Sequence, residues 1–191
     1  SNTGSYAWAV PGPASESCLV RVTDVAYPGV YDVSDASFSI ITTIPGAERA
    51  ALIALYSATG GESWGDRTGW KTPPLYIDGF AMPGTEGNWH GVTVDQPTSS
   101  VIAIDLSMNS LSGFIPPELG DLTNLQYLNL YYNALGGSIP AELGNLTQLK
   151  LLDLSIQTWN KLTGSIPAAL GNLVNLEQLR LDNNELSGVI P

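Results

Sequence analysis

The second half of this 191-residue chain repeats one phrase four times. The stretch LGGSIPAELGNLTQL at residues 135–149 returns as LTGSIPAALGNLVNL at residues 162–176. The aligned units begin at Val101, Leu125, Leu149 and Leu176, so the period is about 24 residues with one longer unit of about 27. A fixed period in this range predicts a solenoid, in which each coil buries its apolar face only by stacking on its neighbours.

Each unit contains residue types that fit one coil. Two leucine-like residues separated by one position predict a short strand with one inward face, and stacked coils then form a parallel sheet. The pairs are Ile104 and Leu106, Leu128 and Leu130, Leu152 and Leu154, and Leu179 and Leu181. Glycine allows a sharp turn, whereas proline fixes an extended segment that cannot become helix. The repeated ones are Gly113, Gly137, Gly164 and Gly188, and Pro116, Pro140, Pro167 and Pro191. The PPELGDL-type segments predict a short helical or 3₁₀ turn before the next strand.

A repeated asparagine follows each strand, at Asn109, Asn133, Asn160 and Asn184. An amide both donates and accepts hydrogen bonds, so we expect these side chains to form an internal ladder that satisfies backbone groups where the strand turns away. In the long unit three extra residues separate Leu154 from Asn160. We expect the excess to leave the coil as a bulge at the end of the strand, at residues 156–159.

This pattern resembles the plant-type subclass of the leucine-rich repeat family, L-x-x-L-x-L-x-x-N-x-L-x-G-x-I-P, over residues 101–191. The resemblance implies an α/β solenoid, a curved right-handed coil with a parallel sheet on its concave side, and four units, the last incomplete. It also implies an extracellular or cell-surface setting, because members of this subclass occur in receptors, inhibitors and surface proteins that bind other molecules without chemistry.

Residues 45–100 resemble the N-terminal cap of the same family. GAERAALIALYSATGG has Leu52, Leu55 and Tyr56 at helical spacing, and NWHGVTV alternates as a strand. Many plant caps have cysteines flanking this motif, and the matching positions here are Gly87 and Val94. Without that disulfide, the tryptophans must hold the cap together. The missing cysteines resemble bacterial members more than plant ones.

Residues 1–44 differ in kind from the repeats. SYAWAV, SCLVRV and SFSII alternate apolar with polar residues and predict a short antiparallel β segment. The string resembles the last strands of an immunoglobulin-like sandwich of bacterial surface proteins. Asp24, Asp32 and Asp35 cluster in one turn. They fit loop capping or, alternatively, calcium coordination.

Composition excludes several classes of function. The chain has 7 Lys and Arg against 18 Asp and Glu, a net charge of -11, which disfavours nucleic acid and anionic membrane. No stretch is apolar enough for a membrane helix, so we expect no membrane insertion. One cysteine, Cys18, and one histidine, His90, leave no disulfide framework and no Cys- or His-based metal site. No nucleophile elbow, phosphate loop or dinucleotide fingerprint is present, so we expect no enzyme and no cofactor.

The sequence therefore favours a recognition module that binds a protein or polysaccharide on the concave face. Residues that flank the inward leucines should face the ligand, and exposed aromatics beside carboxylates suit protein loops or sugar rings. The predicted ligand-binding residues are Tyr127, Asn129, Tyr131, Tyr132, Asp105, Asp153 and Trp159. In an alternative interpretation, the tyrosines merely pack on each other across the coils.

A rival hypothesis is that the repeats form a structural spacer or assembly unit of a larger surface protein or filament. The chain stops at Pro191 within its fourth coil and starts within an apparent sandwich. We therefore expect either a piece of a longer protein or end-to-end self-association, since both edges would expose apolar surface or unpaired strand groups.

Overall fold

The computed structural model describes residues 15–18, 21–23, 31–33, 38–40 and 43–190. The chain divides into two compact units, residues 1–42 and 43–191. In the first unit, β1 (Ser15–Cys18) pairs antiparallel with β4 (Phe38–Ile40), and β2 (Arg21–Thr23) pairs antiparallel with β3 (Tyr31–Val33). The described residues do not include the strand expected at 5–10, nor do they include Asp24 and Asp35. The immunoglobulin-like assignment stays a prediction.

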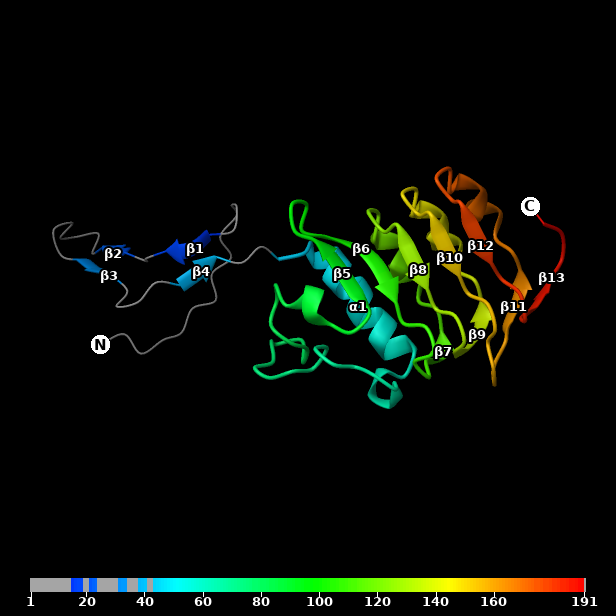
Figure 1. The fold of residues 1–191 in the computed structure, drawn as a ribbon, viewed down its shortest axis with the longest axis horizontal. Helices are drawn as coiled ribbons and strands as arrows, with labels where there is room; N and C mark the ends of the chain where they lie inside the picture. Colours follow the sequence, from blue (N-terminus) through cyan, green and yellow to red (C-terminus); the bar gives the residue numbers. More distant parts are fainter. Residues whose placement is uncertain (1–14, 19–20, 24–30, 34–37, 41–42, 191) are drawn as a thin grey trace. The chain divides into compact units, whose positions relative to one another are not determined.

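In the second unit, four parallel strands stack one per repeat (Figure 1). They are β6 (Ser100–Asp105), β8 (Tyr127–Asn129), β10 (Leu151–Asp153) and β12 (Gln178–Arg180). The strands are in register, so that Ala103, Tyr127, Leu151 and Gln178 form one row across the sheet. This arrangement confirms the parallel sheet expected from the paired leucines.

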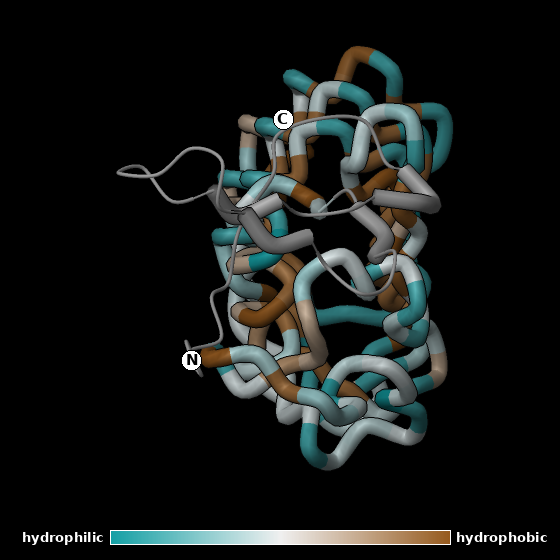
Figure 2. Tube along the Cα trace, turned by 90° about the vertical axis from the view of Figure 1, so that its left-hand side faces the viewer, coloured by the Kyte–Doolittle hydropathy of each residue, from teal (hydrophilic) through white to brown (hydrophobic). Residues whose placement is uncertain are grey.

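The inward leucines form the core of the solenoid. In the first three coils the paired residues are fully buried, from Ile104 and Leu106 to Leu152 and Leu154. Leu179 is 44% exposed because β12 is the edge strand of the sheet. Figure 2 shows hydrophobic stretches recurring from coil to coil between hydrophilic ones. Burial of these side chains is the main favourable term that holds neighbouring coils together.

The return half of each coil contains the turns that the repeated prolines and glycines predict. Short 3₁₀ helices follow Pro116, Pro140 and Pro167, as expected; they are η3 (Pro117–Asp121), η4 (Ala141–Asn145) and η5 (Ala168–Asn172). The four repeated glycines all have positive φ, between 75° and 108°. The structure also contains a second parallel sheet, which the sequence does not predict. Its strands are β7 (Ser112–Phe114), β9 (Ala134–Ser138), β11 (Leu162–Ser165) and β13 (Glu185–Ser187).

One helix and one antiparallel strand cover the first coil. α1 (Gly46–Ala58) buries Ala51, Leu52 and Leu55 and packs beside η3. The α1 carboxylate of Glu48 accepts a hydrogen bond from the Val101 N–H (2.6 Å), which ties the helix to β6. β5 (Val92–Asp95) pairs antiparallel with β6. No helix of the described residues combines the length and apolarity that crossing a bilayer requires.

Aromatic rings fill the space between α1 and the chain that follows it. Trp64, Trp70 and Trp89 are at most 5% exposed, and Tyr56 and Phe80 join them with ring centroids 4.7–5.9 Å apart. The short helices η1 (Gly61–Ser63) and η2 (Glu86–Asn88) lead into and out of this cluster. Such ring pairs contribute about 0.5–1.5 kcal/mol each beyond the area they bury.

A buried arginine joins α1 to the loop at 71–91. Arg49 pairs with the carboxylates of Asp78 and Glu86, donates to the Ala81 carbonyl (2.7 Å) and lies 5.2 Å from the centre of the Trp89 ring. Burial tends to raise the pKa of Asp78, but hydrogen bonds from Arg49 and the Phe80 N–H outweigh it and hold that pKa below its usual range. The loop, rich in proline and glycine, is therefore fixed by charge as well as by packing.

Gly87 and Val94, the positions that correspond to the missing disulfide, face each other. A Cβ placed on Gly87 would lie 3.7 Å from the Val94 Cβ, which is the separation that disulfides require, about 3.5–4.5 Å. We predict that the G87C/V94C double variant forms a disulfide and raises the free energy of unfolding by about 2 kcal/mol, because the closed loop is short. Thermal unfolding with and without reductant measures this gain. Either single cysteine variant should show no response to reductant, and a double variant whose thiols stay free would contradict the prediction.

The internal amide ladder exists, but one of its predicted members is wrong. The Asn133 side chain accepts hydrogen bonds from the N–H groups of Asn109 and Leu111, both at 3.0 Å, and donates to the carbonyls of Leu106 and Leu130. The Asn184 amide occupies the same place between the third and fourth coils.

In the third coil this role belongs to Gln157 and not to Asn160. The Gln157 amide accepts from the Leu135 N–H (2.9 Å) and donates to the carbonyls of Leu130 and Leu154. Asn160 is exposed. Gln157 stands three residues after Leu154, the spacing at which Asn133 follows Leu130. Position relative to the strand therefore decides which amide enters the core. The extra methylene of glutamine, compared with asparagine, does not prevent its burial.

The bulge of the long unit also lies slightly later than expected. The sequence predicts that Ile156 leaves the coil, yet its N–H donates to the Asp182 carbonyl (2.9 Å), and its φ of 52° is close to the 53° of Tyr132 one coil earlier. Only the segment between Gln157 and Leu162 is longer than in the other units. Three residues, Thr158, Trp159 and Asn160, thus form the insertion.

Candidate functional site

The predicted ligand-binding residues fall into two groups, one on the parallel sheet of β6, β8, β10 and β12, called the concave sheet after its expected curvature, and one beside it. Tyr127 and Asn129 lie on β8, Asp105 ends β6 and Asp153 ends β10. Tyr131 lies two residues after the end of β8. Tyr132 and Trp159 instead line a hollow at the end of this sheet, next to the insertion.

The polar residues that end the strands have a structural task. The side-chain Oδ1 of Asp105, Asn129 and Asp153 each accepts a hydrogen bond from the N–H two residues further on, at 3.0–3.1 Å. Such local bonds satisfy the backbone where the strand ends and the chain begins to turn. Asp105 is nevertheless exposed and Asn129 half-buried, so both residues keep accessible surface.

Asp153 is not part of an accessible surface, contrary to the sequence-based expectation. It is 4% exposed, because the next coil places Arg180 beside it with the guanidinium nitrogen 3.5 Å from Oδ2. Asp153 also accepts a hydrogen bond from the Ser155 hydroxyl (2.5 Å). A ligand on the concave sheet would therefore meet Arg180 at this row and not the carboxylate.

The tyrosines present both exposed and packed ring surface. Tyr127 is 46% exposed and Tyr132 is 45% exposed, whereas Tyr131 is half-buried. The rings of Tyr131 and Tyr132 lie 5.8 Å apart at an angle of 43°, so these two side chains do pack on each other. The pair connects the concave sheet with the hollow at its end.

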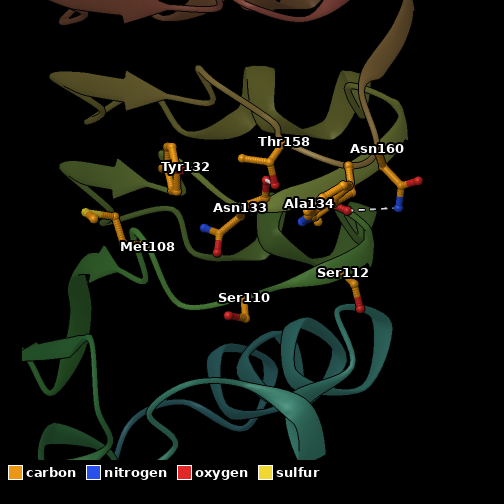
Figure 3. A pocket seen from close by; sticks show the side chains of 9 residues that line it. Met108, Ser110, Ser112, Tyr132, Asn133, Ala134, Thr158 and Asn160 are labelled. Atoms are coloured by element: carbon orange, nitrogen blue, oxygen red, sulfur yellow. Dashed lines mark hydrogen bonds between the residues drawn. The ribbon is translucent and has the colours of Figure 1, made fainter.

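The hollow beside the concave sheet has a volume of about 550 Å³ (Figure 3). Its walls come from three consecutive coils: Met108, Ser110 and Ser112 from the first, Tyr132, Asn133 and Ala134 from the second, and the insertion Thr158, Trp159 and Asn160 from the third. The volume lies in the range of small-ligand sites, roughly 300–1,000 Å³. The sequence predicts Tyr132 and Trp159 as ligand residues but not the other residues that line the hollow. The three extra residues of the third unit are the signal in the sequence that marks this hollow.

Three hydrogen bonds to the second coil fix the insertion at its two ends. The Thr158 N–H and hydroxyl both donate to the Asn133 carbonyl, at 2.6 and 3.0 Å. The Asn160 amide nitrogen donates to the Ala134 carbonyl (3.0 Å), as the dashed line in Figure 3 shows. Trp159, between these two anchors, is 92% exposed. The insertion therefore holds a large aromatic side chain in solvent at a defined place.

Comparison with known proteins places the repeats in context. The family model described as Leucine Rich Repeat matches residues 100–122, 124–146 and 175–191, and the unit with the insertion falls between the last two matches. The LRR receptor-like serine/threonine-protein kinase FEI 2 of Arabidopsis thaliana is 50% identical over 44 residues, which are 23% of this chain and 8% of that protein. The related kinase SIK1 of Oryza sativa subsp. japonica is 47% identical over 42 residues, 22% of this chain and 4% of its own length.

Solved structures resemble a larger part of the chain. The crystal structure of PEPR1-AtPEP1 has a TM-score of 0.61 and 31% identity over 77% of this chain and 19% of its own. The Arabidopsis receptor kinase HAESA ectodomain, in complex with a peptide hormone ligand, has a TM-score of 0.53 and 32% identity over 77% of this chain and 23% of its own. The two kinases reported above are plant proteins. The missing cap cysteines predict a bacterial-like member, and this assignment stays a prediction. The chain therefore carries leucine-rich repeats that are related to those of plant receptor-like kinases.

Proposed function

We propose that residues 101–191 form a non-catalytic recognition surface that binds a protein or peptide on the concave sheet, in an extracellular or cell-surface setting. The observation that carries this proposal is the half-exposed ring of Tyr127 on β8, beside polar side chains whose orientation is fixed by hydrogen bonds. Exposed tyrosines on a rigid backbone lose little conformational entropy on binding and are enriched among residues that dominate interfaces.

Two similar structures support a protein ligand. The HAESA ectodomain is in complex with a peptide hormone, and the GASSHO1/SCHENGEN3 ectodomain is in complex with CASPARIAN STRIP INTEGRITY FACTOR 2. The latter ectodomain has a TM-score of 0.51 and 38% identity over 61% of this chain. In this proposal residues 45–100 act as the cap and residues 1–44 as a separate β segment. A polysaccharide on the concave sheet remains the weaker alternative.

Replacement of the three tyrosines tests the surface. Peptides are selected from a random displayed library on the immobilised full chain, and their affinity is then measured for the Y127A/Y131A/Y132A variant. We expect a loss of about 2 kcal/mol in binding free energy, since anchor residues contribute that much, with a folded-state stability nearly unchanged for the exposed rings. Alanine at the exposed residues Val174, Glu118 and Thr147 outside the concave sheet provides the matched control.

The rival role, a spacer or self-assembling unit, predicts a different outcome. A spacer would retain no peptide specifically, or would retain peptides whose affinity the three tyrosines do not influence. Self-association of the full chain, measured by sedimentation at increasing concentration, would favour the assembly role. Peptide binding that depends on the three tyrosines would exclude the hypothesis that the repeats serve only as a spacer and bind no ligand.

A further inference from the structure

The hollow between the first three coils differs in chemistry from the rest of the molecule. The chain has 25 charged residues, 7 basic and 18 acidic, yet none of the nine residues that line the hollow is charged. A charged ligand would lose its hydration there without gaining an ionic partner. The lining therefore selects for a neutral ligand.

Aromatic surface and hydrogen-bonding groups meet in this hollow. Trp159, at 92% exposure, and Tyr132, at 45%, offer apolar ring surface with a polar tip on each side chain. Ser110 and Ser112 are exposed hydroxyl residues on the opposite wall. Because the Asn160 amide nitrogen is engaged with the Ala134 carbonyl, its Oδ1 is left as an oriented acceptor.

A sugar ring matches this combination of groups. A pyranose carries apolar C–H faces, which stack on aromatic rings, and a rim of hydroxyls that both donate and accept hydrogen bonds. Convergent polar groups around an apolar surface are the general pattern of small-ligand sites. An apolar peptide side chain would use the rings but would leave the hydroxyls of the opposite wall without partners, at a cost in affinity.

We propose that the hollow formed by the insertion binds a neutral oligosaccharide, with a pyranose ring stacked on Trp159 and Tyr132 and its hydroxyls bonded to Ser110, Ser112 and Asn160. This site shares Tyr132 with the tyrosine surface but otherwise lies beside the concave sheet, and it does not rest on the function proposed for that sheet. It assigns a purpose to the three inserted residues, which the solenoid does not need for its own stacking.

Titration of the full chain with oligosaccharides tests the site. Cellohexaose, xylohexaose, mannohexaose and maltohexaose serve as neutral probes and hexagalacturonate as the acidic one, with binding measured by calorimetry and by tryptophan fluorescence. We expect saturable binding of at least one neutral probe and none of hexagalacturonate. No binding of any neutral probe at millimolar concentration, or equal binding of the acidic probe, would overturn the proposal.

Two variants locate the binding. Deletion of residues 158–160 restores the regular spacing of the other coils, and Trp159→Ala removes only an exposed ring; each should weaken sugar binding by about tenfold or more. Val174→Ala, an exposed residue outside the hollow, and Tyr127→Ala on β8 should leave it unchanged. If the deletion variant does not fold, as judged by circular dichroism, Trp159→Ala decides alone.

The two proposals can fail separately. Sugar affinity that Trp159→Ala does not alter would remove the site from the hollow even if peptide binding by the tyrosines holds. If the selected peptides lose affinity in Trp159→Ala while no sugar binds, the hollow belongs to a peptide site and the oligosaccharide assignment is wrong. Sugar binding that Trp159→Ala abolishes stands whether or not any peptide is found.

Discussion

Replacement of Asn133 by alanine should lower the free energy of unfolding by about 3–5 kcal/mol. The side chain is 2% exposed and satisfies the N–H groups of Asn109 and Leu111 as well as the carbonyls of Leu106 and Leu130. Alanine leaves these buried groups without a partner, and each unsatisfied group costs about 1–3 kcal/mol. Chemical denaturation of the variant, followed by circular dichroism, measures the loss.

Asn160 provides the matched control, because it carries the same amide in the position that the sequence suggested for the ladder. Asn160→Ala should change stability by less than about 0.5 kcal/mol, since its side chain is exposed and makes one bond to a carbonyl at the surface. Gln157→Ala should resemble Asn133→Ala. A large loss in Asn160→Ala together with a small loss in Gln157→Ala would reverse our assignment of the third coil.

Replacement of Arg49 by methionine should also cost about 3–5 kcal/mol. Arg49 is 8% exposed and its partner Glu86 is 1% exposed, so the variant leaves a buried carboxylate without its counter-charge. It also removes the bonds that hold Asp78 and the Ala81 carbonyl. Arg67→Met is the control, because the Arg67 pair with Glu62 is exposed and such pairs contribute about 0–1 kcal/mol.

The acid dependence of stability gives a second measurement for Arg49. The pKa of Asp78 is lowered in the folded chain, so its contribution is fully present above the ordinary carboxyl pKa of 3.8 and is lost as the pH falls through the lower folded value. Arg49→Met removes a principal cause of that shift. The variant should therefore lose less stability than the parent chain when the pH is lowered below about 4. An equal acid-induced loss in both would mean that Arg49 does not set the charge state of Asp78.

The sequence alone determined the architecture of the repeat segment. The period requires one coil per unit, the paired leucines such as Leu128 and Leu130 require an inward strand face, and Gly137 with Pro140 requires the chain to turn at fixed places. These features are local and are repeated in each unit, so any one copy predicts the others. The break of three residues in the third unit was visible in the same way.

Only the tertiary structure decided which side chains are available at the surface. Alternation along the strand predicts Asp153 as a ligand residue, but Arg180 of the following coil covers it, 27 residues further along the chain. Asn160 looked like a ladder residue from its type, but the distance along the coil from Leu154 brought Gln157 into the core instead. The hollow likewise arises only when residues of three coils are brought together. A periodic sequence specifies what each coil does for itself, whereas exposure and site geometry depend on what the neighbouring coil places on top of it.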